Sequence, residues 1–128
     1  MKYSVINPPR AFSVGTDDSI ELRDCMHIEL ESDEQVTFFN ETTEYDVVKK
    51  SWGFYATPSM NGRLIRHNLL TALLRNPKTE MCFICLVKND QVKDYQKYLA
   101  DEELEHICWL SDNETLARIC NSEKKGVP

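Results

Sequence analysis

Aromatic and cationic side chains alternate within one stretch of the chain, residues 44–74. An aromatic ring can stack on a sugar or a base, a lysine or arginine can bind a phosphate, and an asparagine can hydrogen-bond hydroxyl groups. These residue types predict a ligand-binding surface, although a solvated sheet face that binds nothing explains the same pattern. The candidate ligand-binding residues are Lys50, Trp52, Tyr55, Asn61, Arg63, Arg66 and Asn68.

A turn signal at Asn61-Gly62 lies at the centre of this stretch. Both residues tolerate positive φ, which is typical of a type I′ turn between two paired strands. We therefore predict a hairpin in which Trp52 lies opposite Thr71, and alternation assigns its side chains to two faces. The predicted core face holds Trp52, Phe54, Ala56, Ile65 and Leu69, and the other face holds Tyr55, Leu64, Arg66, Asn68 and Leu70.

Two residues interrupt this hairpin. Pro58 cannot donate to a ladder, and an interior glycine such as Gly53 often marks a bulge. The alternative is therefore a shorter hairpin preceded by a shaped loop over residues 52–59. A loop of aromatic and small residues is itself a good candidate for a ligand site.

Cysteines and histidines near the C-terminus raise the question of a metal site. Cys82 and Cys85 form a C-x-x-C pair, and His106 and Cys108 follow later, which are residue types that bind zinc. The segment around the pair has the pattern of a strand, however, and residues three apart on a strand point to opposite faces. Free cysteine is a small, readily buried hydrophobe. We therefore predict buried thiols, no metal and no cofactor, with a zinc quartet as the alternative.

Length and composition bound the classes of function. The chain has 128 residues, enough for one modest core, and its 41% hydrophobic and 28% charged residues are ordinary for a globular protein. A net charge of −6 with dispersed Lys and Arg argues against nucleic-acid binding and against an anionic membrane surface. Neither a membrane-spanning run nor a signal peptide is visible. We therefore predict a cytoplasmic protein without membrane insertion, whose five cysteines stay reduced.

Hydrophobic periodicity predicts an α+β fold, a single domain of mainly antiparallel β-sheet, sandwich- or barrel-like, with one or two short C-terminal helices. Residues 81–87, apolar on both faces, are the predicted central strand and pair with residues 69–74. Asp24-Cys25 is expected to break a strand, and Ser111 opens a capping box for the last helix. The predicted layout is an extended arm at residues 1–18, antiparallel strands at residues 19–88, helix, strand and helix at residues 89–121, and a frayed tail at residues 122–128.

Four strings of the sequence resemble a set of small bacterial proteins: NPPR near the start, DEQVTF at residues 33–38, EYDVVKKSWGFYATPSMNGRL at residues 44–64 and ICWL at residues 107–110. These proteins are associated with surface-polysaccharide and nucleotide-sugar gene neighbourhoods and carry no assigned activity. The resemblance spans most of residues 6–110, and the string at residues 44–64 is its specific part. It implies a role in glycan or nucleotide-sugar metabolism and transfers no catalytic residue.

Three functions of different class follow from the residues and the resemblance. The first is a non-catalytic binding or accessory module in surface-polysaccharide or nucleotide-sugar metabolism that holds a sugar or nucleotide sugar. The second is a small enzyme, an isomerase or lyase acting on an activated sugar, with Asp46, Tyr55 or His67 as acid or base. The third is a protein-interaction subunit that forms a homodimer through an exposed sheet.

Overall fold

The protein has an α+β fold in the computed structural model, which describes residues 1–124. Strand accounts for 48% of the described residues and helix for 23%, arranged as three antiparallel sheets, three short α-helices and one 3-10 turn. The predicted α+β class with mainly antiparallel sheet is therefore confirmed. None of the sheets formed by residues 1–124 closes into a barrel.

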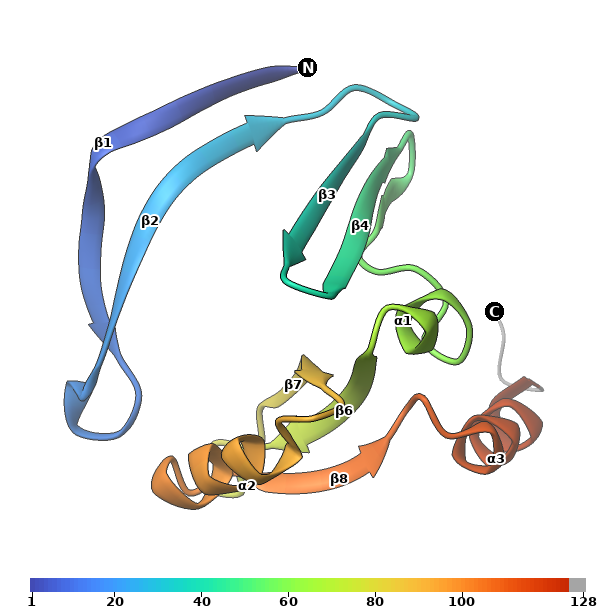
Figure 1. The fold of residues 1–128 in the computed structure, drawn as a ribbon. Coiled ribbons are helices and arrows are strands. Elements are labelled where there is room, and N and C mark those ends of the chain that lie inside the picture. Colours follow the sequence, from blue (N-terminus) through green and yellow to red (C-terminus); the bar gives the residue numbers. More distant parts are fainter. Residues whose placement is uncertain (125–128) are drawn as a thin grey trace. The chain divides into compact units, whose positions relative to one another are not determined.

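The sheets have the strand orders β1-β2, β3-β4-β5 and β7-β6-β8 (Figure 1). The strands are β1 (Lys2–Val14), β2 (Ile20–Glu29), β3 (Gln35–Asn40), β4 (Thr43–Lys50), β5 (Gly53–Tyr55), β6 (Leu69–Arg75), β7 (Cys82–Lys88) and β8 (Glu105–Trp109). The helices are a 3-10 turn, η1 (Thr16–Asp18), and the α-helices α1 (Arg63–Arg66), α2 (Val92–Asp101) and α3 (Asn113–Glu123).

The chain forms two compact units. Unit 1 comprises Met1–Thr37 and Asp46–Ala56, and unit 2 comprises Phe38–Tyr45 together with the described chain from Thr57 onward. The chain therefore crosses between the units within β3, within β4 and after β5. The connected ends of β3 and β4, which we call the Phe38–Tyr45 hairpin, belong to unit 2.

Unit 1 begins with a two-stranded ribbon formed by β1 and β2. The strands pair antiparallel along their length, with an irregular stretch in β1 between Val5 and Arg10. The arm predicted for residues 1–18 is therefore wrong, since most of it is a paired strand. Pro8 and Pro9 suggested unpaired backbone, but they lie in the irregular stretch, where the ladder does not need their missing N–H groups. The break predicted at Asp24-Cys25 is also wrong, because β2 is continuous.

A short hairpin of β4 and β5 completes unit 1. Lys50 lies opposite Gly53, so the chain reverses at Ser51-Trp52 rather than at Asn61-Gly62. The predicted Asn-Gly hairpin is wrong, because Gly62 has a φ of −130° and a type I′ turn needs a positive value there. This dipeptide instead precedes α1, where the Ser59 hydroxyl accepts a hydrogen bond from the Arg63 backbone N–H at 2.8 Å.

Most of the side-chain faces predicted for that hairpin are wrong for the same reason, although Leu69 is buried as expected. Leu64, expected on the outer face, is fully buried on α1. Trp52, Phe54 and Ile65, expected in the core, are exposed. A short helix and a separate hairpin replace one long ladder, so an alternation with period two does not describe the segment.

Unit 2 is built on the sheet of β7, β6 and β8. Ala72 of β6 lies opposite Cys85 of β7 on one side and opposite Trp109 of β8 on the other. The pairing of residues 69–74 with residues 81–87 is confirmed, but the prediction that residues 81–87 are central is wrong, because β6 is the middle strand. Apolar composition marks both strands equally, and it does not record that β7 has a neighbour on one side only.

The hydrophobic core lies entirely in unit 2. Helix α2 packs against β7 and β8, and its Leu99 joins β6 and β7 side chains in one cluster. Among residues 1–124, the buried hydrophobic side chains all belong to this unit. They are Leu64, Leu69, Ala72, Leu74, Val87 and Leu99.

The helix, strand and helix predicted for residues 89–121 are confirmed as α2, β8 and α3. The last helix begins one residue later than its predicted capping box, since Asp112 is the N-cap and its carboxylate accepts the Thr115 backbone N–H at 3.0 Å. Ser111 instead accepts the Thr71 backbone N–H at 3.4 Å. Of the tail predicted for residues 122–128, Ser122 and Glu123 continue α3, and residues 125–128 lie outside the described residues.

Candidate functional site

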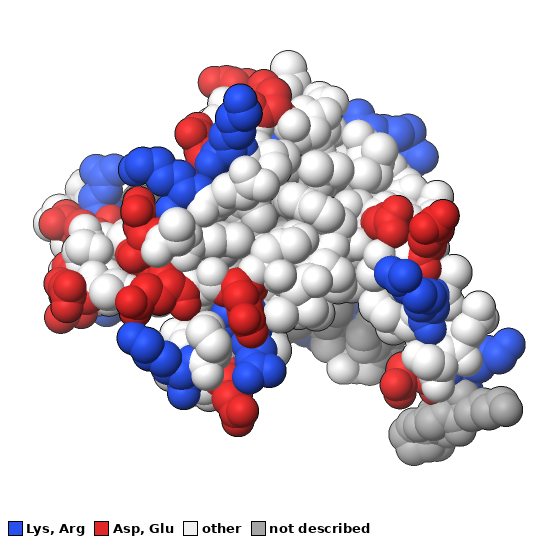
Figure 2. Space-filling model, turned by 90° about the horizontal axis from the view of Figure 1, so that it is seen from below, with Lys and Arg blue, Asp and Glu red and all other residues white. Residues whose placement is uncertain are grey.

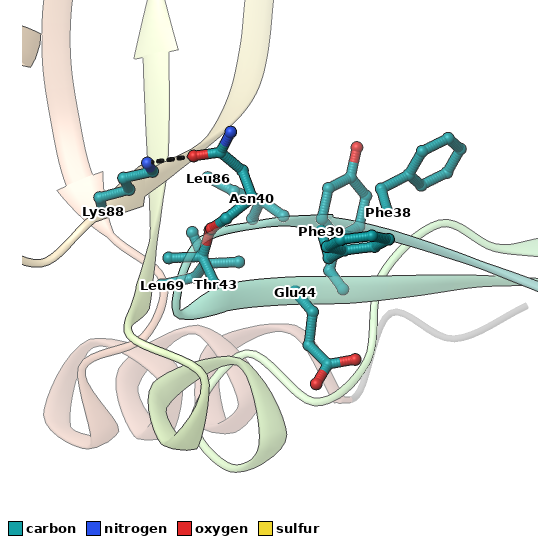
Figure 3. A pocket seen from close by; sticks show the side chains of 9 residues that line it. Phe38, Phe39, Asn40, Thr43, Glu44, Leu69, Leu86 and Lys88 are labelled. Carbon is teal, nitrogen blue, oxygen red and sulfur yellow. Dashed lines mark hydrogen bonds between the residues drawn. The ribbon is translucent and has the colours of Figure 1, made fainter.

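A pocket of about 240 Å³ lies within unit 2, between the Phe38–Tyr45 hairpin and the strands β6 and β7. Figure 3 shows Lys88 and Asn40 at one end of it and the Phe38 and Phe39 rings at the other. Its lining residues are Phe38, Phe39, Asn40, Thr43, Glu44, Tyr45, Leu69, Leu86 and Lys88. Apolar walls with a few polar groups are typical of small-molecule sites, and this volume lies below the roughly 300–1,000 Å³ that is usual for them.

Aromatic rings form one wall of the pocket. The Phe38 and Tyr45 rings lie across the hairpin with their centroids 5.3 Å apart and their planes tilted by 31°. The neighbouring Phe39 is 82% exposed. Exposed rings beside a concave surface can stack on a flat or sugar ring. Leu69 and Leu86 complete the apolar lining from the sheet.

The polar end of the pocket is organised by Lys88. Its ammonium group donates a hydrogen bond to the Asn40 side-chain oxygen at 2.6 Å (Figure 3). It also lies 3.7 Å from the Glu41 carboxylate. The Thr43 hydroxyl donates to the Asn40 carbonyl at 2.8 Å, which fixes the backbone of this turn. The Lys88 ammonium group is therefore held in place at the rim of the pocket, and Glu41 neutralises part of its charge.

Glu44 supplies the carboxylate of the pocket. One of its oxygens lies 3.3 Å from His67 Nδ1, and the other lies 3.9 Å from the Arg63 guanidinium. The cations Lys88 and Arg63 thus balance the carboxylates of Glu41 and Glu44 around the pocket. A pocket with this charge balance suits a ligand whose bound part is uncharged and polar.

Four of the candidate residues from the sequence fall in unit 2. Arg63 reaches Glu44, and Asn68 donates from its side chain to the Thr42 carbonyl at 3.3 Å, so both flank the pocket's hairpin. Asn61 donates instead to the Asn113 side chain at 2.9 Å. Arg66 is exposed on α1.

The other three candidates, Lys50, Trp52 and Tyr55, lie together on the β4–β5 hairpin of unit 1. The Trp52 and Tyr55 rings meet edge to face with centroids 5.4 Å apart, and they are 66% and 57% exposed. Lys50 is hydrogen-bonded to the Asp33 carboxylate, and this bond raises the pKa of Lys50. The predicted rings therefore face water, with a lysine beside them.

Residues suggested as acids or bases are also divided between the units. Asp46 lies in unit 1, where it is buried and its carboxylate accepts the Thr37 hydroxyl at 2.6 Å. Tyr55 lies in unit 1 as well. His67 lies in unit 2 beside Glu44, and this imidazole–carboxylate pair borders the pocket.

Sequence reasoning missed the main lining residues, Phe38, Phe39, Glu44 and Lys88. The available signal was the pair of adjacent phenylalanines directly before the turn that joins β3 to β4. Neighbouring residues on a strand point to opposite faces of the sheet. If one of Phe38 and Phe39 packs in a core, the other must therefore face away from it. Lys88 carried no signal, since only the pairing of β6 with β7 places it opposite Leu69.

The predicted burial of the cysteines is wrong for Cys82, which is exposed, and Cys85 and Cys108 are only half-buried. Cys82 and Cys85 lie on the edge strand β7 and Cys108 lies on the edge strand β8, which accounts for their exposure. Burial raises the pKa of the Cys85 thiol. Within residues 1–124, no group of three or more His, Cys, Asp or Glu side chains is placed to hold a metal ion.

A second cluster that the sequence did not reveal lies around His106 in unit 2. Its ring is hydrogen-bonded to the Tyr95 hydroxyl at 2.9 Å and lies 4.6 Å from the Trp109 ring. Burial against these rings lowers the pKa of His106, because desolvation disfavours the imidazolium. The neutral imidazole is therefore part of the packing between α2 and β8.

This lowered pKa predicts a loss of stability in mild acid. The unfolded chain binds a proton on His106 near its ordinary pKa of about 6.5, whereas the folded protein resists it, so stability falls as the pH drops below that value. The measurement is the melting temperature between neutral and mildly acidic pH. The melting temperature of His106→Gln should fall less on acidification than that of the unmodified protein. An equal fall in both proteins would show that His106 does not cause it.

Charges on the face of the molecule shown in Figure 2 are mixed in sign. In Figure 2 the Lys and Arg side chains lie among Asp and Glu side chains in small clusters, with a broad uncharged area between them. No helix of residues 1–124 combines the length and apolar character needed to cross a bilayer.

Comparison with protein families, curated proteins and solved structures finds no match to this chain.

Proposed function

We propose that the protein is a non-catalytic binding module whose unit 2 pocket takes the sugar ring of a small ligand, either a free sugar or a nucleotide sugar. The observation that carries this proposal is the pocket itself, in which exposed aromatic rings lie beside hydrogen-bonding side chains. A sugar has apolar ring faces and a rim of hydroxyl groups, so it needs both kinds of contact.

The contacts divide naturally between the two ends of the pocket. Phe39 offers an exposed ring face for stacking. Asn40 and Glu44 offer an amide and a carboxylate for hydroxyl groups. Lys88 at the rim is the cation that a phosphate of a nucleotide sugar would meet, after exchanging its contact with Glu41.

The resemblance to small bacterial proteins of surface-polysaccharide and nucleotide-sugar gene neighbourhoods supports the same ligand class. Its specific string, residues 44–64, begins with Glu44 and ends beside Arg63. These two residues form an ion pair at the pocket. The proposal therefore extends to an accessory role in surface-polysaccharide or nucleotide-sugar metabolism.

A thermal-shift and calorimetry panel tests the proposal with nucleotide sugars, the matching free nucleotides and the matching free sugars. We expect a nucleotide sugar or its sugar to raise the melting temperature at about millimolar concentration. Phe39→Ala should weaken binding by about fivefold to tenfold, the loss of a ring contact of roughly 1 kcal/mol. Because Phe39 is 82% exposed, this substitution should leave the fold intact.

Trp52→Ala is the matched control, since it removes an exposed ring of unit 1. Binding should be unchanged in this variant. Binding lost in Trp52→Ala and kept in Phe39→Ala would move the site to the β4–β5 hairpin. Absence of any shift across the panel with the unmodified protein would contradict the proposal.

Lys88→Met should weaken the binding of a nucleotide sugar more than the binding of the free sugar.

One contact favours a second candidate function, an isomerase or lyase acting on an activated sugar. The Glu44 carboxylate lies 3.3 Å from His67 Nδ1 and can orient the imidazole as an acid or base. Product analysis of the same nucleotide-sugar mixtures tests this. Turnover that is lost in His67→Ala would replace the binding module by an enzyme, and unchanged ligands would leave the binding module as the function.

A further inference from the structure

The ribbon of β1 and β2 has one apolar face along its length. Residues opposite each other in an antiparallel pair project to the same side, and the large apolar side chains of the two strands lie opposite each other. We call this side the apolar ribbon face. Its cross-strand pairs include Tyr3 with Ile28, Val5 with Met26, and Phe12 with Leu22.

The reverse side of the ribbon is polar. Ser4 lies opposite His27, and Ser13 lies opposite Glu21. Strands that alternate in this way normally place the apolar side against a core and the polar side in water. The sequence of the ribbon is therefore that of a half-buried sheet.

The apolar ribbon face is nevertheless uncovered. Tyr3 and Val5 are 64% and 62% exposed, and Leu22, Met26 and Ile28 are exposed as well. Within the described chain, unit 1 has no buried hydrophobic side chain. A two-stranded ribbon without a core is marginally stable in water, and a contiguous exposed apolar surface marks an interaction site.

An ion pair divides this face into two apolar ends. Arg10 lies opposite Asp24, and its guanidinium is 3.6 Å from the Asp24 carboxylate. His27 lies 2.9 Å from the same carboxylate. The centre of the face thus carries one cation and one anion, which balance each other although the chain as a whole has a charge of −6.

We propose that the apolar ribbon face packs against the same face of a second copy of this chain, about a two-fold axis near Arg10 and Asp24. This axis runs parallel to the strands, so that β1 of one ribbon lies over β2 of the other and the row that holds Arg10 and Asp24 is its own complement. Each Arg10 meets the partner's Asp24. Each end of one ribbon covers the same end of the other.

A second copy would cover the exposed side chains of this face. Tyr3, Val5, Leu22, Met26 and Ile28 are between 37% and 64% exposed, and a standard-size interface buries about 800 Å² per partner. Covering both ribbons at once gives unit 1 the apolar burial that it lacks as a single chain. This surface is separate from the residues that line the unit 2 pocket.

Light scattering after gel filtration, over a broad range of concentration, tests the dimer. We expect a mass of twice 14.9 kDa that falls toward the single-chain value on dilution. Val5→Glu on the apolar face should give the single-chain mass at all concentrations. Ser4→Glu, its neighbour on the polar face, is the matched control and should remain dimeric. Leu22→Glu should repeat the Val5→Glu result at the other end of the ribbon.

Circular dichroism of each variant confirms that the ribbon variants are folded. A single-chain mass for the unmodified protein, or a dimer that survives both Val5→Glu and Leu22→Glu, would overturn the proposal. The two-fold axis has its own test. Arg10→Glu and Asp24→Arg should each weaken the dimer, and an equal mixture of the two should restore it as a heterodimer. An unrestored mixture would overturn this arrangement.

Discussion

Replacing Leu74 by alanine is expected to lower the free energy of unfolding by about 3 kcal/mol, the largest effect of any single substitution considered for this chain. Leu74 lies on the central strand β6 and is 2% exposed. It belongs to the cluster in which Ala72, Val87 and Leu99 join β6, β7 and α2. Removal of its side chain leaves a cavity that strands paired on both sides of β6 cannot close.

Urea denaturation, followed by circular dichroism, measures this change. Ile107→Ala is the matched control, because Ile107 lies on β8 of the same sheet and is 47% exposed. Its loss should stay below about 1 kcal/mol. Equal losses for the two variants would show that the packing of Leu74 does not dominate the core of unit 2.

Replacing Thr71 by valine is expected to raise the free energy of unfolding by about 1 kcal/mol. Thr71 is fully buried on β6, and its hydroxyl has no hydrogen-bond partner among residues 1–124. An unpaired buried hydroxyl has lost its water without compensation. Valine keeps the β-branched shape that suits a strand and removes the polar group.

Thr37→Val is the natural comparison, since it makes the same chemical change on another strand. The Thr37 hydroxyl donates to the buried Asp46 carboxylate at 2.6 Å. Its removal should therefore destabilise the protein by roughly 1 to 2 kcal/mol. Thermal melts of the two variants should shift in opposite directions. A shift in the same direction would mean that the Thr71 hydroxyl is satisfied in solution.

Much of the fold was readable from local patterns. The pairing of residues 69–74 with residues 81–87 and the order of helix, strand and helix after them follow from apolar runs, turn residues and helix periodicity. Each of these elements is joined to its sequence neighbour by a short connection. Local chemistry and final contacts therefore agree in this part of the chain.

The errors lie where tertiary pairing decides between local alternatives. Asn61-Gly62 favours a type I′ turn in isolation, yet β5 is already paired with β4, and the chain after it forms α1. Likewise, Pro8 and Pro9 suit an unpaired arm until β2 pairs on both sides of them. Which strand finds which partner depends on contacts distant in sequence, and a local pattern does not contain them.

Two of the candidate ligand-binding residues, Arg63 and Asn68, flank the unit 2 pocket, and the rings of Trp52 and Tyr55 are exposed. The sequence treated all seven candidates as one surface because they are close in the chain. They instead belong to two units, since the chain leaves unit 1 after Ala56.

The interleaving of the units along the chain also bears on how the protein can be divided. Phe38–Tyr45 interrupts unit 1 in sequence but belongs to unit 2. A fragment that starts at Thr57 keeps the strands β6, β7 and β8 but lacks the hairpin wall of the pocket. No single cut therefore leaves both units whole, and the gene has no point at which one unit could be exchanged or lost by simple fusion or truncation.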